Sequence, residues 1–150
     1  LVEALRAPGR QAAEAQEHPL RDLLLEAAEQ WNGLLEVRLE VPDEVEELLV
    51  DAPAMAESAV EAARECLVNS VRHGRARNAQ LRFSCEWIDG VRRLVLEVVD
   101  DGRVNPVAAA LSGFGGTSLR TAGATREIIP LDGGTRVRIV WAAKAVSIPA

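Results

Sequence analysis

The middle of the chain alternates so regularly that it restricts the possible folds more than any other stretch. From residue 79 to residue 87 every odd-numbered position is apolar and every even-numbered position is polar. This period-two alternation predicts a half-buried β-strand. Asp89-Gly90 is a strong hairpin turn, and Arg93–Val99 is expected to be the partner strand. Because Val95 and Val99 add apolar side chains to its second face, the partner is expected to be a central strand.

An amphipathic helix and a short strand are expected before this hairpin. Apolar residues recur at three and four positions over residues 20–31, which predicts a helix. Pro19 opens this helix and Gly33 stops it. Residues 37–41 then alternate like a half-buried strand, which Pro42 closes.

A long helix is expected in the first half of the chain. Asp51 is a plausible N-cap, and Pro53 falls in the first helical turn. An apolar stripe runs over residues 55–67, and the helix is expected to continue to about His73, with Gly74 ending it.

A second hairpin is expected near the C-terminus. Asp132-Gly133-Gly134 forms its turn, and residues 135–141 alternate as the last strand. The three tryptophans are all expected to pack in the core: Trp31, Trp87 and Trp141.

Two hairpins together with amphipathic helices predict an α/β fold. We expect a two-layer α/β sandwich, with helices on one face of a mixed, mainly antiparallel sheet. Residues 20–144 are expected to form one domain, after a linker or the end of a preceding helix at 1–19 and before a tail at 145–150. Because the first residue is Leu rather than Met, we expect a piece of a longer protein.

Composition narrows the possible partners and location. The net charge of −6 argues against nucleic acid as the main partner. No apolar run approaches the length of a membrane span, so no membrane contact is expected from this domain. Cys66 and Cys85 lack metal or redox spacing and are expected to be buried thiols in a reducing, cytoplasmic compartment.

The end of the long helix presents a polar stripe. Glu65 and Asn69 are four residues apart and share one helix face, which Arg72 and His73 continue. A carboxylate beside a carboxamide offers hard oxygen ligands suited to Mg²⁺, and the cations could meet phosphate charge. Taken alone, the stripe is more often a solvated helix end, and His73 is as easily a helix-end histidine that a carbonyl satisfies.

Two further motifs follow in the sequence. Asp100-Asp101-Gly102 comes directly after a hydrophobic strand, where a carboxylate in a cleft can accept a hydrogen bond from an amine. By itself it is also a common turn signal. The glycines of Gly113-Phe114-Gly115-Gly116 would let backbone N–H groups approach phosphate, although such a run alone can be a surface loop.

In this order the three motifs resemble the nucleotide-binding domain of sensor histidine kinases, in the Bergerat-fold (GHKL) ATPase superfamily. Residues 65–76 resemble its asparagine box, and the two later motifs resemble its first and second glycine boxes. Arg72, His73 and Ala76 are similar to the Arg-His-x-x-Ala ending of the short-lidded kinases. The resemblance covers residues 20–143 and implies the fold that the patterns predict.

The resemblance also implies roles and partners. Glu65 would orient or deprotonate the attacking group, Asn69 would ligate Mg²⁺, and Asp100 would bind the adenine amino group. ATP and Mg²⁺ would be the cofactors, and the γ-phosphoryl group would pass to a histidine on a separate dimerisation domain and then to a response regulator. The remaining nucleotide-site residues would be Arg72, His73, Gly102, Gly113, Gly115, Gly116 and Thr117.

The chain departs from the family pattern at two places. Val104 stands where the family often has glycine, and Gly116 stands where it usually has leucine. Between the glycine boxes, residues 103–112 are expected to form a short, mobile ATP lid. Residues 119–124 are expected to form a short helix.

Two other functions stay open. One is a serine kinase of the anti-sigma class, which shares the superfamily motifs. The other is a degenerate module that binds nucleotide or a partner without kinase activity. His18 is interpreted as a linker residue, since it lacks the acidic, Arg-flanked helix expected of a phosphoacceptor.

Overall fold

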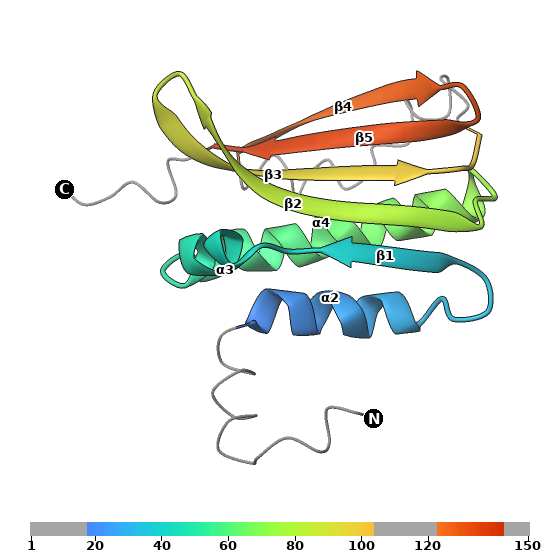
Figure 1. The fold of residues 1–150 in the computed structure, drawn as a ribbon, viewed down its shortest axis with the longest axis horizontal. Coiled ribbons are helices and arrows are strands. Elements are labelled where there is room, and N and C mark those ends of the chain that lie inside the picture. Colours follow the sequence, from blue (N-terminus) through green and yellow to red (C-terminus); the bar gives the residue numbers. More distant parts are fainter. Residues whose placement is uncertain (1–17, 104–122, 143–150) are drawn as a thin grey trace, which may run out of the picture.

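The computed structural model describes residues 18–103 and 123–142. No helix in these two ranges is both long and apolar enough to cross a membrane. Figure 1 shows the helices and strands in chain order, which are α2 (Pro19–Glu29), β1 (Glu36–Glu40), α3 (Asp43–Leu49), α4 (Pro53–Arg72), β2 (Asn78–Ile88), β3 (Val91–Asp100), β4 (Ala124–Leu131) and β5 (Gly134–Trp141).

The strands form one sheet in the order β1-β2-β3-β5-β4. β1 runs parallel to β2, whereas the other three neighbouring pairs are antiparallel. The predicted turn between β2 and β3 is present, with positive φ angles of 55° at Asp89 and 78° at Gly90. The mixed, mainly antiparallel sheet and the central place of β3 are therefore confirmed.

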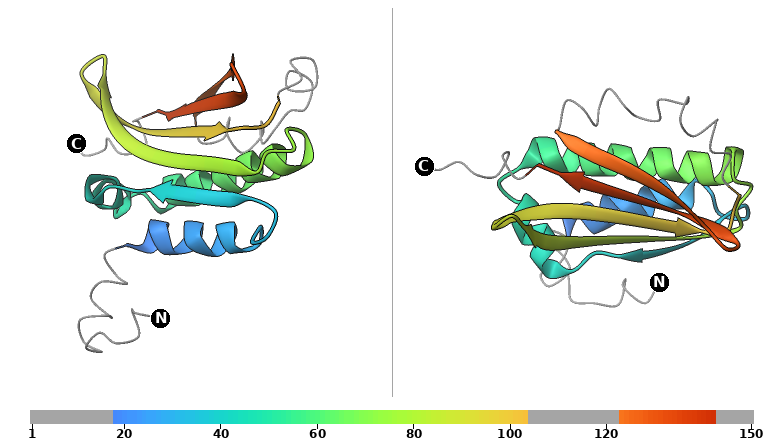
Figure 2. Two further views of the ribbon diagram at one scale, coloured as in Figure 1. Left: turned by 45° about the vertical axis from the view of Figure 1, so that its right-hand side comes forward. Right: turned by 90° about the horizontal axis from the view of Figure 1, so that it is seen from above.

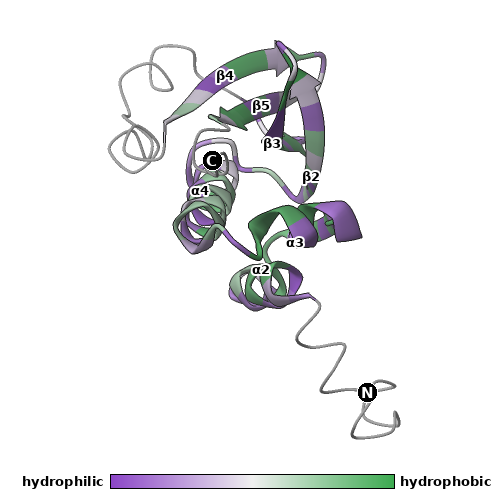
Figure 3. Ribbon diagram, turned by 90° about the vertical axis from the view of Figure 1, so that its left-hand side faces the viewer, coloured by the Kyte–Doolittle hydropathy of each residue, from purple (hydrophilic) through white to green (hydrophobic). Residues whose placement is uncertain are grey.

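The helices described by the structure cover one face of this sheet (Figures 1 and 2). Leu96 on β3 pairs with Phe83 on one side and Ile139 on the other, so the three side chains point to the same face. All three are completely buried. Figure 3 shows hydrophilic and hydrophobic bands mixed along the strands, as expected where only one face is covered. The predicted two-layer α/β sandwich is confirmed.

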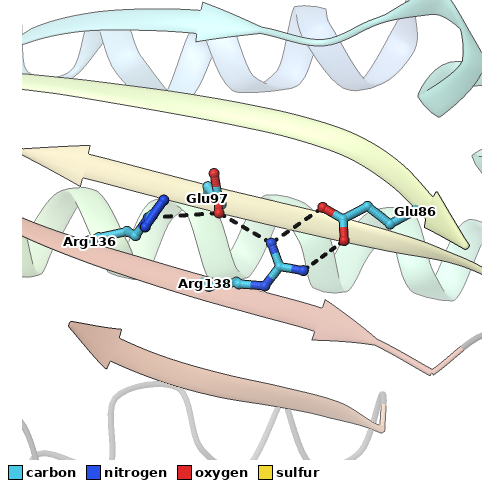
Figure 4. A network of polar contacts seen from close by, with 4 residues as sticks. All are labelled: Glu86, Glu97, Arg136 and Arg138. Carbon is cyan, nitrogen blue, oxygen red and sulfur yellow. Dashed lines mark hydrogen bonds and ion pairs between the residues drawn. The ribbon is translucent and has the colours of Figure 1, made fainter. Parts of the chain in front are cut away.

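Charged side chains link three strands on the uncovered face (Figure 4). Arg138 on β5 donates to Glu86 on β2 at 2.7 Å and to Glu97 on β3 at 3.2 Å. Arg136 lies 3.8 Å from the same Glu97. The hydrogen bonds that Arg138 donates to Glu86 are the main reason that the pKa of Arg138 is raised, and Glu97 raises this pKa further.

The start of α4 corrects one prediction. The N-cap residue is Ala52, and no side chain caps the helix, so the assignment of Asp51 as cap is wrong. Pro53 fixes φ at the first helical position, where a missing N–H costs no hydrogen bond. At its other end the helix stops after Arg72, as the sequence predicts.

The helix α3 was not predicted, and it supplies the cap of α2. Glu46 on α3 is only 4% exposed. Its two carboxylate oxygens accept the backbone N–H groups of Leu20 and Arg21, each at 3.0 Å. These are donors of the first turn of α2 that have no partner within that helix. A carboxylate from a different helix thus replaces the usual local cap.

The tryptophans differ from one another in burial. Trp141 is fully buried, and its Nε1–H donates to Ser58 Oγ on α4 at 2.9 Å. Trp31 is partly buried against the core. Trp87 is 73% exposed, so its assignment to the core is wrong. By alternation along β2 its side chain belongs to the face that the helices cover. The β2–β3 hairpin, however, curves away from the helices near its turn (Figure 2).

Candidate functional site

The last turns of α4 and its C-cap residue, His73, carry four of the predicted site residues. Glu65 and Asn69 are half-buried, whereas Arg72 and His73 are exposed. The backbone carbonyl of Asn69 accepts the N–H groups of both His73 and Gly74 at 3.0 Å. These two bonds close the helix, so the Asn69 side chain stands one turn before its end.

Glu65 has a buried oxygen without a hydrogen-bond partner. Its Oε1 accepts no hydrogen bond from the part of the chain that the structure describes. Burial raises the pKa of Glu65, the charge of Glu61 raises it further, and Arg126 on β4 lowers it. A buried acceptor without a partner costs free energy unless a ligand or water meets it. The Asn69 carboxamide offers the kind of hard oxygen that Mg²⁺ prefers, and the unpartnered Glu65 oxygen on the same helix face can accept a hydrogen bond from a water or hydroxyl group.

Asp100 ends β3 with both carboxylate oxygens engaged. Its Oδ2 accepts the hydroxyl of Ser70 on α4 at 2.5 Å. Its Oδ1 accepts the backbone N–H of Gly102 at 2.9 Å. The first bond ties the strand to the residue after Asn69, and the second shapes the turn. The carboxylate is therefore held in one orientation.

Asp101 has a structural part in the same turn. Its Oδ1 accepts the backbone N–H groups of Arg77 and Asn78 at 2.8 and 3.0 Å, and its Oδ2 accepts the Asn78 amide at 2.8 Å. These hydrogen bonds, that of the Asn78 side chain first, lower the pKa of Asp101 to about 2. The turn is thereby fixed to the start of β2.

Gly102 packs directly against Gly74. A Cβ at Gly102 would lie 2.5 Å from the carbonyl oxygen of Gly74. That oxygen also accepts the backbone N–H of Arg103 at 3.0 Å. The hydroxyl of Thr135, a buried residue of β5, donates to the carbonyl of Gly102 at 3.4 Å. The turn after β3 and the end of α4 thus touch main chain to main chain.

These contacts bring the first two sequence motifs together. Asn69 and Asp100 belong to segments about thirty residues apart, and the Ser70 hydrogen bond joins those segments. Other predicted features lie outside the described residues, namely Gly113, Gly115, Gly116, Thr117, the lid over 104–112 and the helix at 119–122. At Ala124 the helix prediction is wrong, because this residue pairs with Trp141 as the first residue of β4.

Sequence reasoning missed several residues around the site. Ser70 and Asp101 are adjacent to predicted residues, but their partners lie on other elements, so spacing along the chain could not identify them. Arg126 occupies a helix-facing position of β4, opposite the fully buried Ile139. A charged residue at an apolar position of an alternating strand is the one signal in the sequence that marks it.

A cleft of about 440 Å³ also borders Asp100. It is lined by residues of the uncovered sheet face, including Arg38, Gln80 and Val99, and by the β4–β5 turn. No residue of α4 lines it. The cleft therefore lies apart from the place where the two motifs meet.

Solved structures with a similar fold include histidine kinase domains. The histidine kinase domain of a blue-light activated kinase from Erythrobacter litoralis aligns with a TM-score of 0.56 at 18% identity, over 84% of this chain and 60% of that one. The ATP binding domain of PrrB from Mycobacterium tuberculosis aligns with a TM-score of 0.53 at 22% identity, over 80% and 89%. The chain has the fold of these kinase domains.

The kinase AdeS from Acinetobacter baumannii has the same fold, with a TM-score of 0.55 at 13% identity, over 83% of this chain and 63% of AdeS. The chain thus spans under two thirds of the length of both the Erythrobacter and the Acinetobacter domains. No family model matches the sequence. A search of curated proteins by sequence also finds no match.

Proposed function

We propose that this chain is the ATP-binding catalytic domain of a sensor histidine kinase of the short-lidded kind. The observation that carries the proposal is the Ser70–Asp100 hydrogen bond, because it joins the asparagine-box helix to the first glycine-box turn. The fold shared with histidine kinase domains supports it. In the proposal, the domain passes the γ-phosphoryl group of ATP to a histidine on a separate dimerisation domain, and a response regulator receives it next.

Each described residue has a distinct part in this proposal. Asp100 accepts the exocyclic amine of adenine, since a fixed carboxylate presents only acceptors. Asn69 holds Mg²⁺ through its neutral oxygen, and Glu65 orients or deprotonates the attacking group. Mg²⁺ supplies neutralisation of the phosphate charge when it is bound. The exposed Arg72 and His73 stand where they can meet phosphate oxygens.

The remaining parts of the proposal rest on sequence. In it, Gly113, Gly115, Gly116 and Thr117 hold the phosphates of ATP. In the same proposal the domain works in the cytoplasm, and neither nucleic acid nor membrane is its own partner.

Binding of a non-hydrolysable ATP analogue with and without Mg²⁺ tests the proposal. Asn69→Ala should abolish the Mg²⁺-dependent part of the affinity, because it removes the ligand. Glu65→Gln should bind nearly as well as the parent but lose phosphoryl transfer to a supplied phosphoacceptor domain. Glu57→Gln, an exposed position on the same helix, is the matched control and should change neither.

The outcomes separate the alternatives. Parent-like binding and transfer in both site variants would exclude this site. Nucleotide binding by the parent without transfer to histidine or serine would favour the degenerate module. Transfer to serine instead of histidine would favour the anti-sigma class of kinase.

Asp100→Asn tests adenine recognition separately. The amide replaces a pure acceptor with a group that is half donor, so the affinity for ATP should fall roughly tenfold while the protein stays folded. Calorimetric titration measures the affinity, and circular dichroism checks the fold. Parent-like affinity would remove Asp100 from the site.

A further inference from the structure

Ser70 is a buried hydroxyl in direct contact with Asp100. Its side chain lies on the inner face of α4 and is 3% exposed. Its Oγ donates to Asp100 Oδ2 at 2.5 Å, a short bond of the kind that a hydroxyl makes to a carboxylate. The sequence resemblance gives this residue no role.

Ser70 and Asp100 together have no side-chain hydrogen left to donate to a ligand. A serine hydroxyl has a single hydrogen, which is committed to Asp100. The other carboxylate oxygen is already occupied by the N–H of Gly102. Only acceptor lone pairs remain on Ser70 Oγ and on the carboxylate. A ligand that approaches this pair therefore meets acceptors and no side-chain donor.

This arrangement discriminates between two classes of purine. A 6-amino group can donate to the acceptors that remain. A 6-keto oxygen would face them with its own lone pairs and find no hydrogen. Buried polar groups left unpaired in this way are a strong source of specificity. A fixed carboxylate also gives the 6-amino group a stronger hydrogen bond than one that can turn, and the Ser70 bond is the contact from α4 that holds its orientation. Loss of that bond should therefore weaken the binding of the 6-aminopurine and leave that of the 6-oxopurine nearly unchanged.

We propose that Ser70 is a positioning residue that sets the selectivity of this site for 6-aminopurine nucleotides over 6-oxopurine nucleotides. This inference rests on the proposed nucleotide-binding function and adds to it a second residue that determines specificity. Ser70 acts through Asp100 by fixing which lone pairs of the carboxylate face the base.

The test compares an ATP analogue with the matching inosine triphosphate analogue, which carries a 6-keto group. Both affinities are measured by calorimetry at saturating Mg²⁺ for the parent, Ser70→Ala and Ser70→Thr. In Ser70→Ala the ratio of the two affinities should fall roughly tenfold, the loss of one hydrogen bond to a charged group. Ser70→Thr keeps the hydroxyl and should retain the ratio.

Ser58→Ala is the matched control. Ser58 is another buried serine of α4, and its Oγ accepts the Trp141 Nε1–H. Its loss should lower stability without changing the affinity ratio. If Ser70→Ala does not fold, Ser70→Cys replaces it, since a thiol is a weak donor of similar size. The same fall in ratio is then expected.

The possible outcomes are distinct. An unchanged ratio in Ser70→Ala, or in Ser70→Cys when that variant replaces it, overturns the inference while the proposed function stands. An equal fall in both affinities has the same meaning, because it is what a purely structural hydroxyl would give. A folded parent that binds neither analogue overturns the proposed function and this inference with it.

Discussion

At Gly102 the main chain of one motif touches the main chain of another. A Cβ on this residue would lie 2.5 Å from the carbonyl oxygen of Gly74 and 2.8 Å from its carbon. Neither atom belongs to a side chain that could rotate away. Glycine is required at position 102 by proximity, whereas at position 90 it is only favoured, by a φ of 78°, and has open space around it.

We therefore expect Gly102→Ala to destabilise the protein by about 2 kcal/mol or more, because backbone must move to admit the methyl group. Gly90→Asn is the control, and it should change stability by less than about 1 kcal/mol, since asparagine tolerates positive φ. Urea denaturation measures both. Equal stability of the parent and Gly102→Ala would show that the two motifs can separate at little cost.

The sequence proposes some residues of the candidate site and misses others. The family resemblance proposes Glu65, Asn69 and Asp100 through their motifs, and their roles stay predictions. Ser70 and Asp101 could not be found in this way, because their hydrogen-bond partners lie on other elements. Spacing along the chain does not show which residues of different elements are in contact.

Among the elements, α2 depends on a residue far along the chain for its start. Its own N-cap residue, His18, makes no capping hydrogen bond through its side chain. The capping acceptors are the oxygens of Glu46 on α3. The packing of α2 and the folding of α3 are therefore linked.

Glu46→Ala should lower stability by about 2 kcal/mol, since two N–H groups lose a charged acceptor and the helix loses its cap. Glu47→Ala is the matched control, as Glu47 is the next residue of the same helix and is exposed. Thermal denaturation monitored by circular dichroism compares them. Equal melting temperatures for the two variants would rule out the cap.

The contact between α4 and β5 includes one buried polar pair. Ser58→Ala would leave the indole N–H of Trp141 without its acceptor at a fully buried position. We expect a loss of about 1–3 kcal/mol. In Trp141→Phe the same Ser58→Ala change should cost much less, because no indole donor remains. A double-mutant cycle by urea denaturation gives the coupling, and additive effects would contradict it.

Prediction of the elements succeeded where periodicity was long. The strands β2, β3 and β5 and the helix α4 were recognised from repeating apolar positions. The helix α3 was missed because seven residues provide too few periods to distinguish it from a loop. Trp87 was misplaced because alternation gives the face of a strand but not how far the opposite layer extends.

For the whole molecule, stability should depend on pH through Asp101. Its pKa in the folded chain is about 2, lowered from the ordinary 3.8 first by the hydrogen bonds from Asn78 and then by that from Arg77. A lowered pKa means that the ionised form stabilises the fold above the ordinary value, and that this contribution declines as the pH falls towards about 2.

Asp101→Ala should therefore be less stable than the parent near neutral pH, and the difference should narrow steadily from about pH 4 downwards. Urea denaturation at a series of pH values measures this difference. Asp51→Ala is the control. Because Asp51 does not cap α4, its removal should not change how stability depends on pH. A difference that stays constant down to about pH 2.5 would argue against the native hydrogen bonds of Asp101.

The fold class could be predicted for the whole molecule, but the strand order could not. Two hairpins and amphipathic helices restrict the chain to a layered α/β fold. The hairpins specify which strands pair locally. They do not specify that β3 pairs with β5 rather than with β4. That pairing is between strands of different hairpins, so neither turn determines it.

The parallel pairing of β1 with β2 has a kinetic consequence. Both hairpins can form by local zipping, but β1 reaches β2 only after the chain has crossed the sheet through α3 and α4. Closing so long a connection delays the docking of α4, and with it the meeting of Ser70 and Asp100. Folding rates should therefore respond to Leu96→Ala in the hairpin core, whereas Leu39→Ala in β1 should mainly speed unfolding.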